Sequence, residues 1–203
     1  MKELVLLSTV AVTILCSFQS CGNSKMARMT SDVFVYQNGT EIEIKGVSQE
    51  VELDRKEFSI RFLNRQYDSD TKEFYAAQIT AFKDKNELSK IKVGLSKQDL
   101  PCFEPSSGMA PYESGSYESL IFSNEGHHYL FYENHDRKRV ELIWQMGDNL
   151  KLEFPISSFH VDGNDVSMND LPLSEFYLAI LIDKNLNGII ESGELTKLTL
   201  KFK

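Results

Sequence analysis

Apolar and polar residues alternate along most of the chain, and this period of two constrains the fold more than any other feature. The alternation is clear over residues 58–62, 150–154 and 198–202. Successive side chains of a strand point to opposite faces, so each run predicts a strand with one buried face. Windows with helical periodicity are short and limited to residues 87–92 and 96–100. The sequence therefore predicts an all-β fold.

Turn signals separate the strand-like runs. Asn38-Gly39 lies between the runs 33–36 and 40–45, which favours a β-hairpin. Residues 176–182 are nearly all apolar, which predicts a strand that is buried on both faces. About a dozen short strands with turns between them predict an immunoglobulin-like β-sandwich.

A weak internal repeat suggests a further level of organisation. Residues 73–77 (EFYAA) are similar to residues 175–179 (EFYLA). Two related β units, residues 32–100 and residues 101–203, would explain this similarity. Short β-hairpins also resemble one another by chance, so the interpretation as one unit or as two stays open.

The charge of the chain limits its partners. Its 203 residues include 30 acidic and 22 basic side chains, which gives a formal net charge of −8, and 41% of the residues are hydrophobic. These values are typical of a folded, soluble domain. Because no basic stripe is present to neutralise phosphates, nucleic acid is excluded as a partner.

The N-terminus has the features of a secretory signal. A short charged start, Met1 to Glu3, precedes an apolar run over residues 4–15. A transmembrane helix needs about 20 apolar residues, so this run is too short to span a bilayer. We therefore interpret residues 1–20 as a signal peptide.

The end of this signal contains a cysteine in a distinctive context. Ser20, a small residue, precedes Cys21, and Gly22 follows it. This resembles the lipobox of bacterial lipoproteins, with Phe18 at the position where leucine is commonest; such loosened boxes are similar to those of spirochaetes and the Bacteroides group. The resemblance covers about a tenth of the chain. Secretion with an unmodified cysteine is the alternative interpretation.

The lipobox resemblance implies where the protein resides. Cys21 would carry acyl chains as the first residue of the mature protein, and residues 21–31 would tether the fold to a lipid bilayer. The expected location is the bacterial cell envelope, at the periplasmic or surface face of the outer membrane. Of the other cysteines, Cys16 lies within the signal, so Cys102 has no partner for a disulfide and is expected to be structural.

Residues 183–194 contain the sharpest motif, D-K-N-L-N-G-I-I-E-S-G-E. It resembles the twelve-residue EF-hand calcium loop, in which Gly188 would allow the sharp turn and Ile190 would point into the core. The resemblance implies a calcium ion with these ligands: the side chains of Asp183, Asn185 and Asn187, the carbonyl oxygen of Ile189, Glu191 through a water, and both carboxylate oxygens of Glu194.

The surroundings of this loop depart from the EF-hand pattern. Strand-like runs flank it at residues 176–182 and 196–202, where an EF-hand has helices. We therefore expect a calcium loop between the last two strands, as in secreted bacterial β domains, with a dissociation constant of about 10⁻⁴ to 10⁻³ M. The alternative is a hairpin turn at Asn187-Gly188 that holds no ion.

No catalytic motif is evident, so we expect a protein that is not an enzyme. The expected role is binding or scaffolding in the envelope, with an unknown protein or glycan ligand. One alternative is an envelope hydrolase that uses the region His127–Asp136, which contains three of the four histidines. Another is a calcium-dependent carbohydrate-binding module, which would need exposed aromatic side chains beside the ion.

Overall fold

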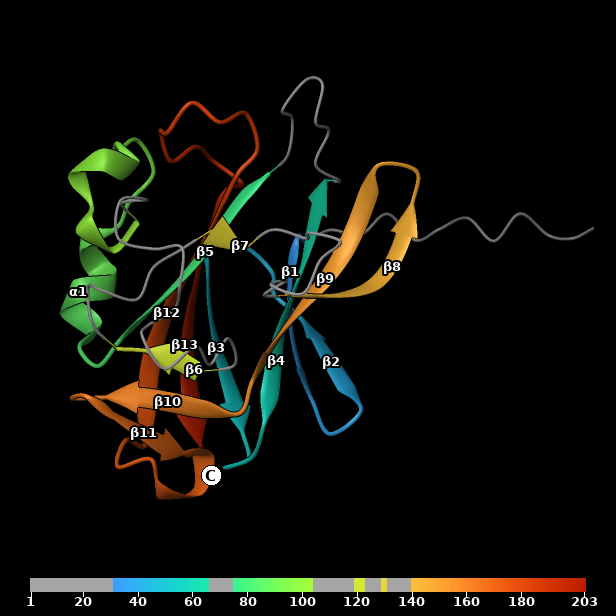
Figure 1. Ribbon diagram of the computed structural model, residues 1–203. Coiled ribbons are helices and arrows are strands. Elements are labelled where there is room, and N and C mark those ends of the chain that lie inside the picture. Colours follow the sequence, from blue (N-terminus) through green and yellow to red (C-terminus); the bar gives the residue numbers. More distant parts are fainter. Residues whose placement is uncertain (1–30, 66–74, 104–118, 123–128, 131–139) are drawn as a thin grey trace, which may run out of the picture.

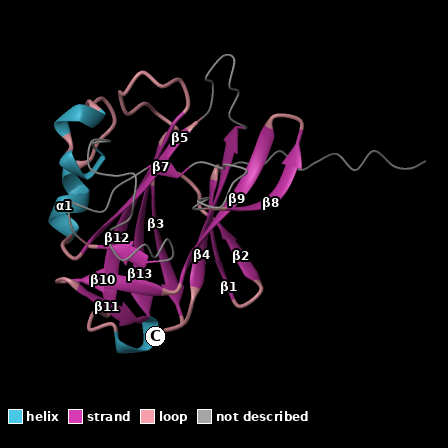
Figure 2. Cartoon of the chain, viewed as in Figure 1, coloured by secondary structure: helices cyan, strands magenta, loops and turns pink. Residues whose placement is uncertain are grey.

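The computed structural model describes residues 31–65, 75–103, 119–122, 129–130 and 140–203 (Figure 1). In these ranges, strands predominate and helices are short (Figure 2). The strands form two five-stranded sheets and one three-stranded sheet, and most pairs are antiparallel. The prediction of a mostly β fold is confirmed, and the arrangement is consistent with a β-sandwich-type fold.

The first sheet has the strand order β2-β1-β4-β9-β8, and all of its pairs are antiparallel. Its strands are β1 Val33–Gln37, β2 Thr40–Glu43, β4 Phe58–Arg65, β8 Glu141–Met146 and β9 Asn149–Ile156. The β1–β2 hairpin turns at Asn38 and Gly39, whose φ angles are 52° and 80°. Positive φ at both turn residues is what a tight two-residue hairpin requires, and the predicted turn is confirmed.

The second sheet has the strand order β3-β13-β12-β5-β7. Its strands are β3 Ser48–Leu53, β5 Ala76–Phe82, β7 Tyr129–Leu130, β12 Glu175–Asp183 and β13 Leu195–Phe202. β3 and β13 pair in parallel, whereas the other pairs are antiparallel. Both large sheets combine strands from residues 32–100 with strands from residues 101–203.

Strand β12 is buried on both faces, as its apolar run predicts. Its even-numbered apolar residues face the main core between the two large sheets, and its odd-numbered ones face a second cluster on the other side. That second cluster packs against the segment 84–103, which contains α1 Lys85–Lys90 and two 3-10 turns, η1 Lys97–Asp99 and η2 Pro101–Phe103. Figure 1 shows α1 on the side of the second sheet away from the first. The second sheet is therefore covered on both faces.

The third sheet is small and has the order β11-β10-β6. Its strands are β6 Ser119–Ile121, β10 Ser158–Val161 and β11 Asn164–Ser167, and the 3-10 turn η4 Met168–Asp170 follows β11. Asp162 and Gly163 have φ angles of 51° and 83° in the β10–β11 turn. This Asp-Gly pair is therefore a hairpin turn.

Cys102 lies in the second cluster with 7% of its surface exposed, as expected for a structural cysteine. Burial raises the pKa of its thiol to about 11, so the reactive thiolate is scarce at pH 8. In a form without residues 1–20 and with Cys21→Ser, Cys102 is the only cysteine. We expect Ellman's reagent to modify it about 100-fold more slowly at pH 8 in buffer than in denaturant. Equal rates in the two solutions would show that the thiol is accessible in the folded protein.

Candidate metal centre

The loop 183–194 connects β12 to β13, the last two strands, and Figure 1 shows it in red beyond the ends of these strands. Leu181 pairs with Leu195, and the backbone N–H of Ile182 donates to the carbonyl oxygen of Glu194 at 2.9 Å. This pairing of β12 with β13 brings the two ends of the loop, Asp183 and Glu194, close together. Both side chains are buried, with exposed fractions of 1% and 5%.

Asp183 has one satisfied and one unsatisfied carboxylate oxygen. Its Oδ2 accepts hydrogen bonds from the backbone N–H of Gly188 at 3.2 Å and from Lys97 Nζ at 3.0 Å. Its Oδ1 is buried without a hydrogen-bond partner, and in the described ranges it is the only carboxylate oxygen in that state. A buried acceptor without a donor costs free energy, and more so when it is charged. A hard cation is a partner that would satisfy it.

Glu194 closes the other side of the loop. Its Oε1 accepts from the backbone N–H of Lys184, and its Oε2 accepts from that of Glu191, both at 2.9 Å. Through these two hydrogen bonds, the Glu194 carboxylate contacts the backbone at the start and near the end of the loop. Each carboxylate oxygen has more than one acceptor site, so both retain capacity for a further ligand.

The exposed part of the loop holds the three remaining predicted side-chain ligands. The Oδ1 atoms of Asn185 and Asn187 accept from backbone N–H groups two residues ahead, at 3.1 and 2.7 Å. Their Nδ2 atoms donate to the two oxygens of Glu191, at 3.1 and 2.8 Å. The structure therefore gathers Asn185, Asn187 and Glu191 into one hydrogen-bonded group, while Asp183 and Glu194 occupy the buried ends of the loop.

The backbone of the loop has the left-handed conformation at the sharp turn. Gly188 has a φ of 73°, which glycine adopts readily, and Leu186 has a φ of 58°, which is unfavourable for a residue with a branched side chain. Ile189 is 40% exposed, whereas Ile190 is fully buried in the second cluster, as predicted. The loop is therefore held in a specific conformation by its own side chains and by the core.

A neighbouring segment, residues 94–97, also holds the loop. Gly94 N–H donates to the carbonyl oxygen of Ile190 at 2.8 Å, and Ile190 N–H donates to that of Leu95 at 2.9 Å. Lys97 N–H donates to the carbonyl oxygen of Gly188 at 2.7 Å. Neither this segment nor the contact of Lys97 with Asp183 was predictable from a motif, because residues 94–97 match no ligand pattern and lie far from the loop in sequence.

The donor chemistry of the loop fits a hard cation. In the described part of the chain, no three or more His, Cys, Asp or Glu side chains gather closely enough to form a metal centre from those residue types alone. The predicted ligand set includes three carboxylates, of Asp183, Glu191 and Glu194, and the structure does not gather these three into such a group. Two amide oxygens and one carbonyl oxygen would supplement them in the predicted set. Calcium accepts such mixed oxygen ligands. The unpartnered Oδ1 of Asp183 is the observation that favours an ion.

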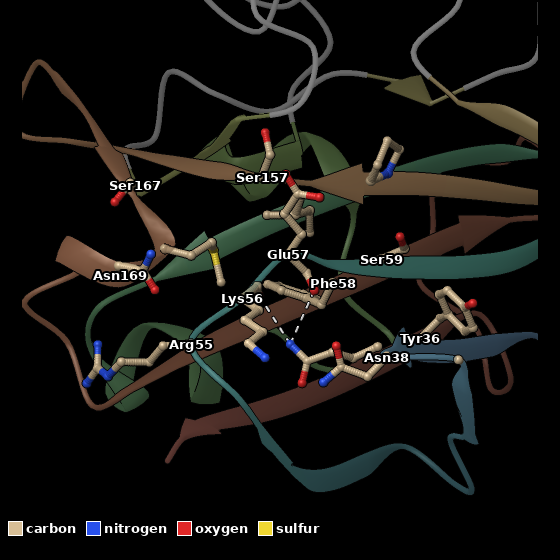
Figure 3. Close-up of a pocket in the computed structure, with 15 residues that line it drawn as sticks. Tyr36, Asn38, Arg55, Lys56, Glu57, Phe58, Ser59, Ser157, Ser167 and Asn169 are labelled. Atoms are coloured by element: carbon tan, nitrogen blue, oxygen red, sulfur yellow. Dashed lines mark hydrogen bonds between the residues drawn. The ribbon is translucent and has the colours of Figure 1, made fainter.

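A separate hollow of about 720 Å³ is lined by residues outside the loop 183–194 (Figure 3). The β1–β2 turn, the β3–β4 connection and the residues around η4 line it. The amide of Gln37 holds the β3–β4 connection, since it donates to the carbonyl oxygens of Asp54 and Lys56 at 3.0 and 3.1 Å. Glu57 is the only carboxylate among the described lining residues, and no histidine lines the hollow. Its described lining therefore offers hydrogen-bonding groups, among them Gln37, Asn38 and Asn169.

Two regions that the sequence analysis singled out lie outside the described residues. The first is residues 1–30, which include Cys21 and nearly all of the tether, and the second is the region His127–Asp136 except for Tyr129 and Leu130. In the part of the chain that the structure does describe, no helix has the length and apolar character that crossing a membrane requires. Comparisons with family models, curated proteins and solved structures found no match for this chain.

Proposed function

We propose that the protein is a lipid-anchored protein of the bacterial cell envelope with a non-catalytic binding or scaffolding role. In this proposal an immunoglobulin-like β-sandwich carries one structural calcium ion in the loop 183–194. The protein would sit at the outer membrane through acyl chains on Cys21 and bind a protein or glycan ligand. The order of the N-terminal residues supports the anchor, as a charged start, an apolar run and a small residue precede the cysteine.

The buried, unpartnered Oδ1 of Asp183 is the observation that carries the calcium assignment. It belongs to the residue that would be the first ligand of the motif, and no donor from the described residues satisfies it. Asp183, Asn185, Asn187, Glu191 and Glu194 would hold the ion through side chains, together with the carbonyl oxygen of Ile189.

The ion would act on stability. It would supply positive charge to carboxylates at both ends of the loop, and so would cross-link β12 to β13. Because Ile190 and Gly188 are bonded to residues 94–97, the same ion would also stabilise the packing of the segment 84–103 on the second sheet. A ligand that binds only the folded state stabilises it by mass action.

The hollow of Figure 3 is a candidate place for a ligand, since its volume of about 720 Å³ lies in the range of small-ligand sites. The hydrolase alternative depends on the region His127–Asp136, most of which lies outside the described residues. The carbohydrate-binding alternative requires exposed aromatic side chains beside the ion, and the described contacts of the loop include none. Binding or scaffolding is the function that we propose.

Metabolic labelling with a palmitate analogue tests the anchor. We expect the label on the wild-type protein and on Cys16→Ala, because Cys16 would be removed with the signal peptide. Cys21→Ala should carry no label and should leave the membrane fraction, since it would lose its acyl chains. Equal labelling of Cys21→Ala and wild type, or no label on either, would contradict the proposed anchor.

A further inference from the structure

Lys97 places a positive charge inside the candidate metal centre. Its side chain is 10% exposed, and its Nζ lies 3.0 Å from Asp183 Oδ2. Its backbone N–H donates to the carbonyl oxygen of Gly188 at 2.7 Å, so both ends of this residue contact the loop. The ammonium group lies at Oδ2, whereas Oδ1 is the oxygen without a partner. Lysine and an ion can therefore use different oxygens of the same carboxylate.

The charge of this lysine opposes the binding of any cation nearby. Three carboxylates, of Asp183, Glu191 and Glu194, give the loop its negative charge, and the ammonium of Lys97 offsets one of them. Lys184, the lysine within the loop itself, directs its Nζ to Asp32. Among the described residues, Lys97 is therefore the side chain whose positive charge contacts the buried end of the site.

We propose that Lys97 sets the affinity of the loop by competing electrostatically with the calcium ion for Asp183. This inference rests on the proposed calcium loop. The ammonium keeps the buried carboxylate partly neutralised when no ion is bound, and it repels the ion when one arrives. The loop is thereby tuned to the millimolar-range calcium concentrations outside the cytoplasm.

A purely structural role of Lys97 predicts the opposite effect of its removal. If the lysine only orients Asp183 for the ion, its replacement by a neutral side chain should weaken calcium binding. If its charge competes with the ion, the replacement should strengthen binding. Coulomb's law, with the dielectric constant of water, gives a factor of roughly ten for a unit charge about 5 Å from a divalent ion.

Calorimetric titration of the full chain in detergent with calcium chloride tests the proposal. Lys97→Met should bind calcium about tenfold more tightly than the wild type. Lys97→Arg, which keeps the charge, should bind with the wild-type affinity. Lys92→Met is the matched control, because it removes an exposed lysine from the same segment, and its affinity should also equal that of the wild type. If Lys97→Met does not fold, Lys97→Gln, which retains a donor for Oδ2, carries the same prediction.

The outcomes separate this inference from the proposed function. Equal or weaker calcium binding by Lys97→Met, with binding by the wild type, would overturn the role of Lys97 and leave the calcium loop intact. Binding by neither protein at millimolar calcium would overturn the calcium loop itself. Binding by Lys97→Met but not by the wild type would support competition between Lys97 and calcium. It would contradict the proposal that the wild-type loop binds calcium.

Discussion

Phe176→Ala should lower the free energy of unfolding by about 3–5 kcal/mol, because it removes the centre of the main core. Phe176 is fully buried on β12, and its ring lies 5.1–6.3 Å from the rings of Phe58, Phe122, Phe159 and Phe202. These rings come from different strands and connections, so the truncation leaves a cavity that no single element can refill. The loss is a large part of the roughly 5–15 kcal/mol that stabilises a typical domain.

Thermal and urea unfolding measure this effect. For a chain of this size, the loss corresponds to a midpoint lower by about 6–20 °C. Ile143→Ala is the control, because Ile143 lies on β8 with 40% of its surface exposed, and it should change stability by less than about 0.5 kcal/mol. Similar losses for both variants would mean that the main core is not where the structure places it.

Calcium should raise the midpoint of thermal unfolding by about 3–10 °C when about 10 mM of the ion replaces chelator. A dissociation constant of about 10⁻⁴ to 10⁻³ M gives a stabilisation of about 1.4–2.7 kcal/mol by mass action. A domain of this size gains about 2–4 °C for each of these kcal/mol. The same concentration of magnesium should raise the midpoint less, because magnesium prefers a smaller and more regular set of ligands.

Asp183→Ala should abolish this calcium-dependent rise. It removes the buried carboxylate, and it also leaves the Lys97 ammonium without that partner, so its midpoint in chelator should fall as well. The informative quantity is therefore the difference between calcium and chelator for each protein. Asp183→Asn keeps the shape of the side chain and should lose the same difference. Asp148→Ala removes a carboxylate that is 77% exposed in the β8–β9 turn, and it should retain the full rise.

The local elements of the fold were predictable from the sequence because short-range rules decide them. Asn38-Gly39 and Asp162-Gly163 mark hairpin turns, since these residues tolerate positive φ. The apolar run 176–182 indicates a strand covered on both faces, and β12 is such a strand. Alternation along residues 58–62 and 150–154 gives the inward faces of β4 and β9.

The pairing of distant elements was not predictable from those rules. The parallel pairing of β3 with β13 joins residues about 150 positions apart, and no periodicity specifies which strand a given edge meets. The same limit explains why one part of the candidate site was predictable and another was not. Its ligand-type residues lie within twelve consecutive positions and match a motif, whereas Lys97 reaches Asp183 from a different segment, 86 residues away. A charged residue that tertiary packing brings to a site from a distant segment has no signature in the local sequence of that site.

The central claim is that the loop 183–194 binds a cation. The structure of a crystal grown with about 10 mM calcium tests this claim most directly. We expect one ion with oxygen ligands at about 2.3–2.6 Å, among them Oδ1 of Asp183 and the carboxylate of Glu194. Anomalous scattering at a long wavelength would identify the ion as calcium. A structure in which Oδ1 of Asp183 still lacks a partner at that concentration would contradict the account.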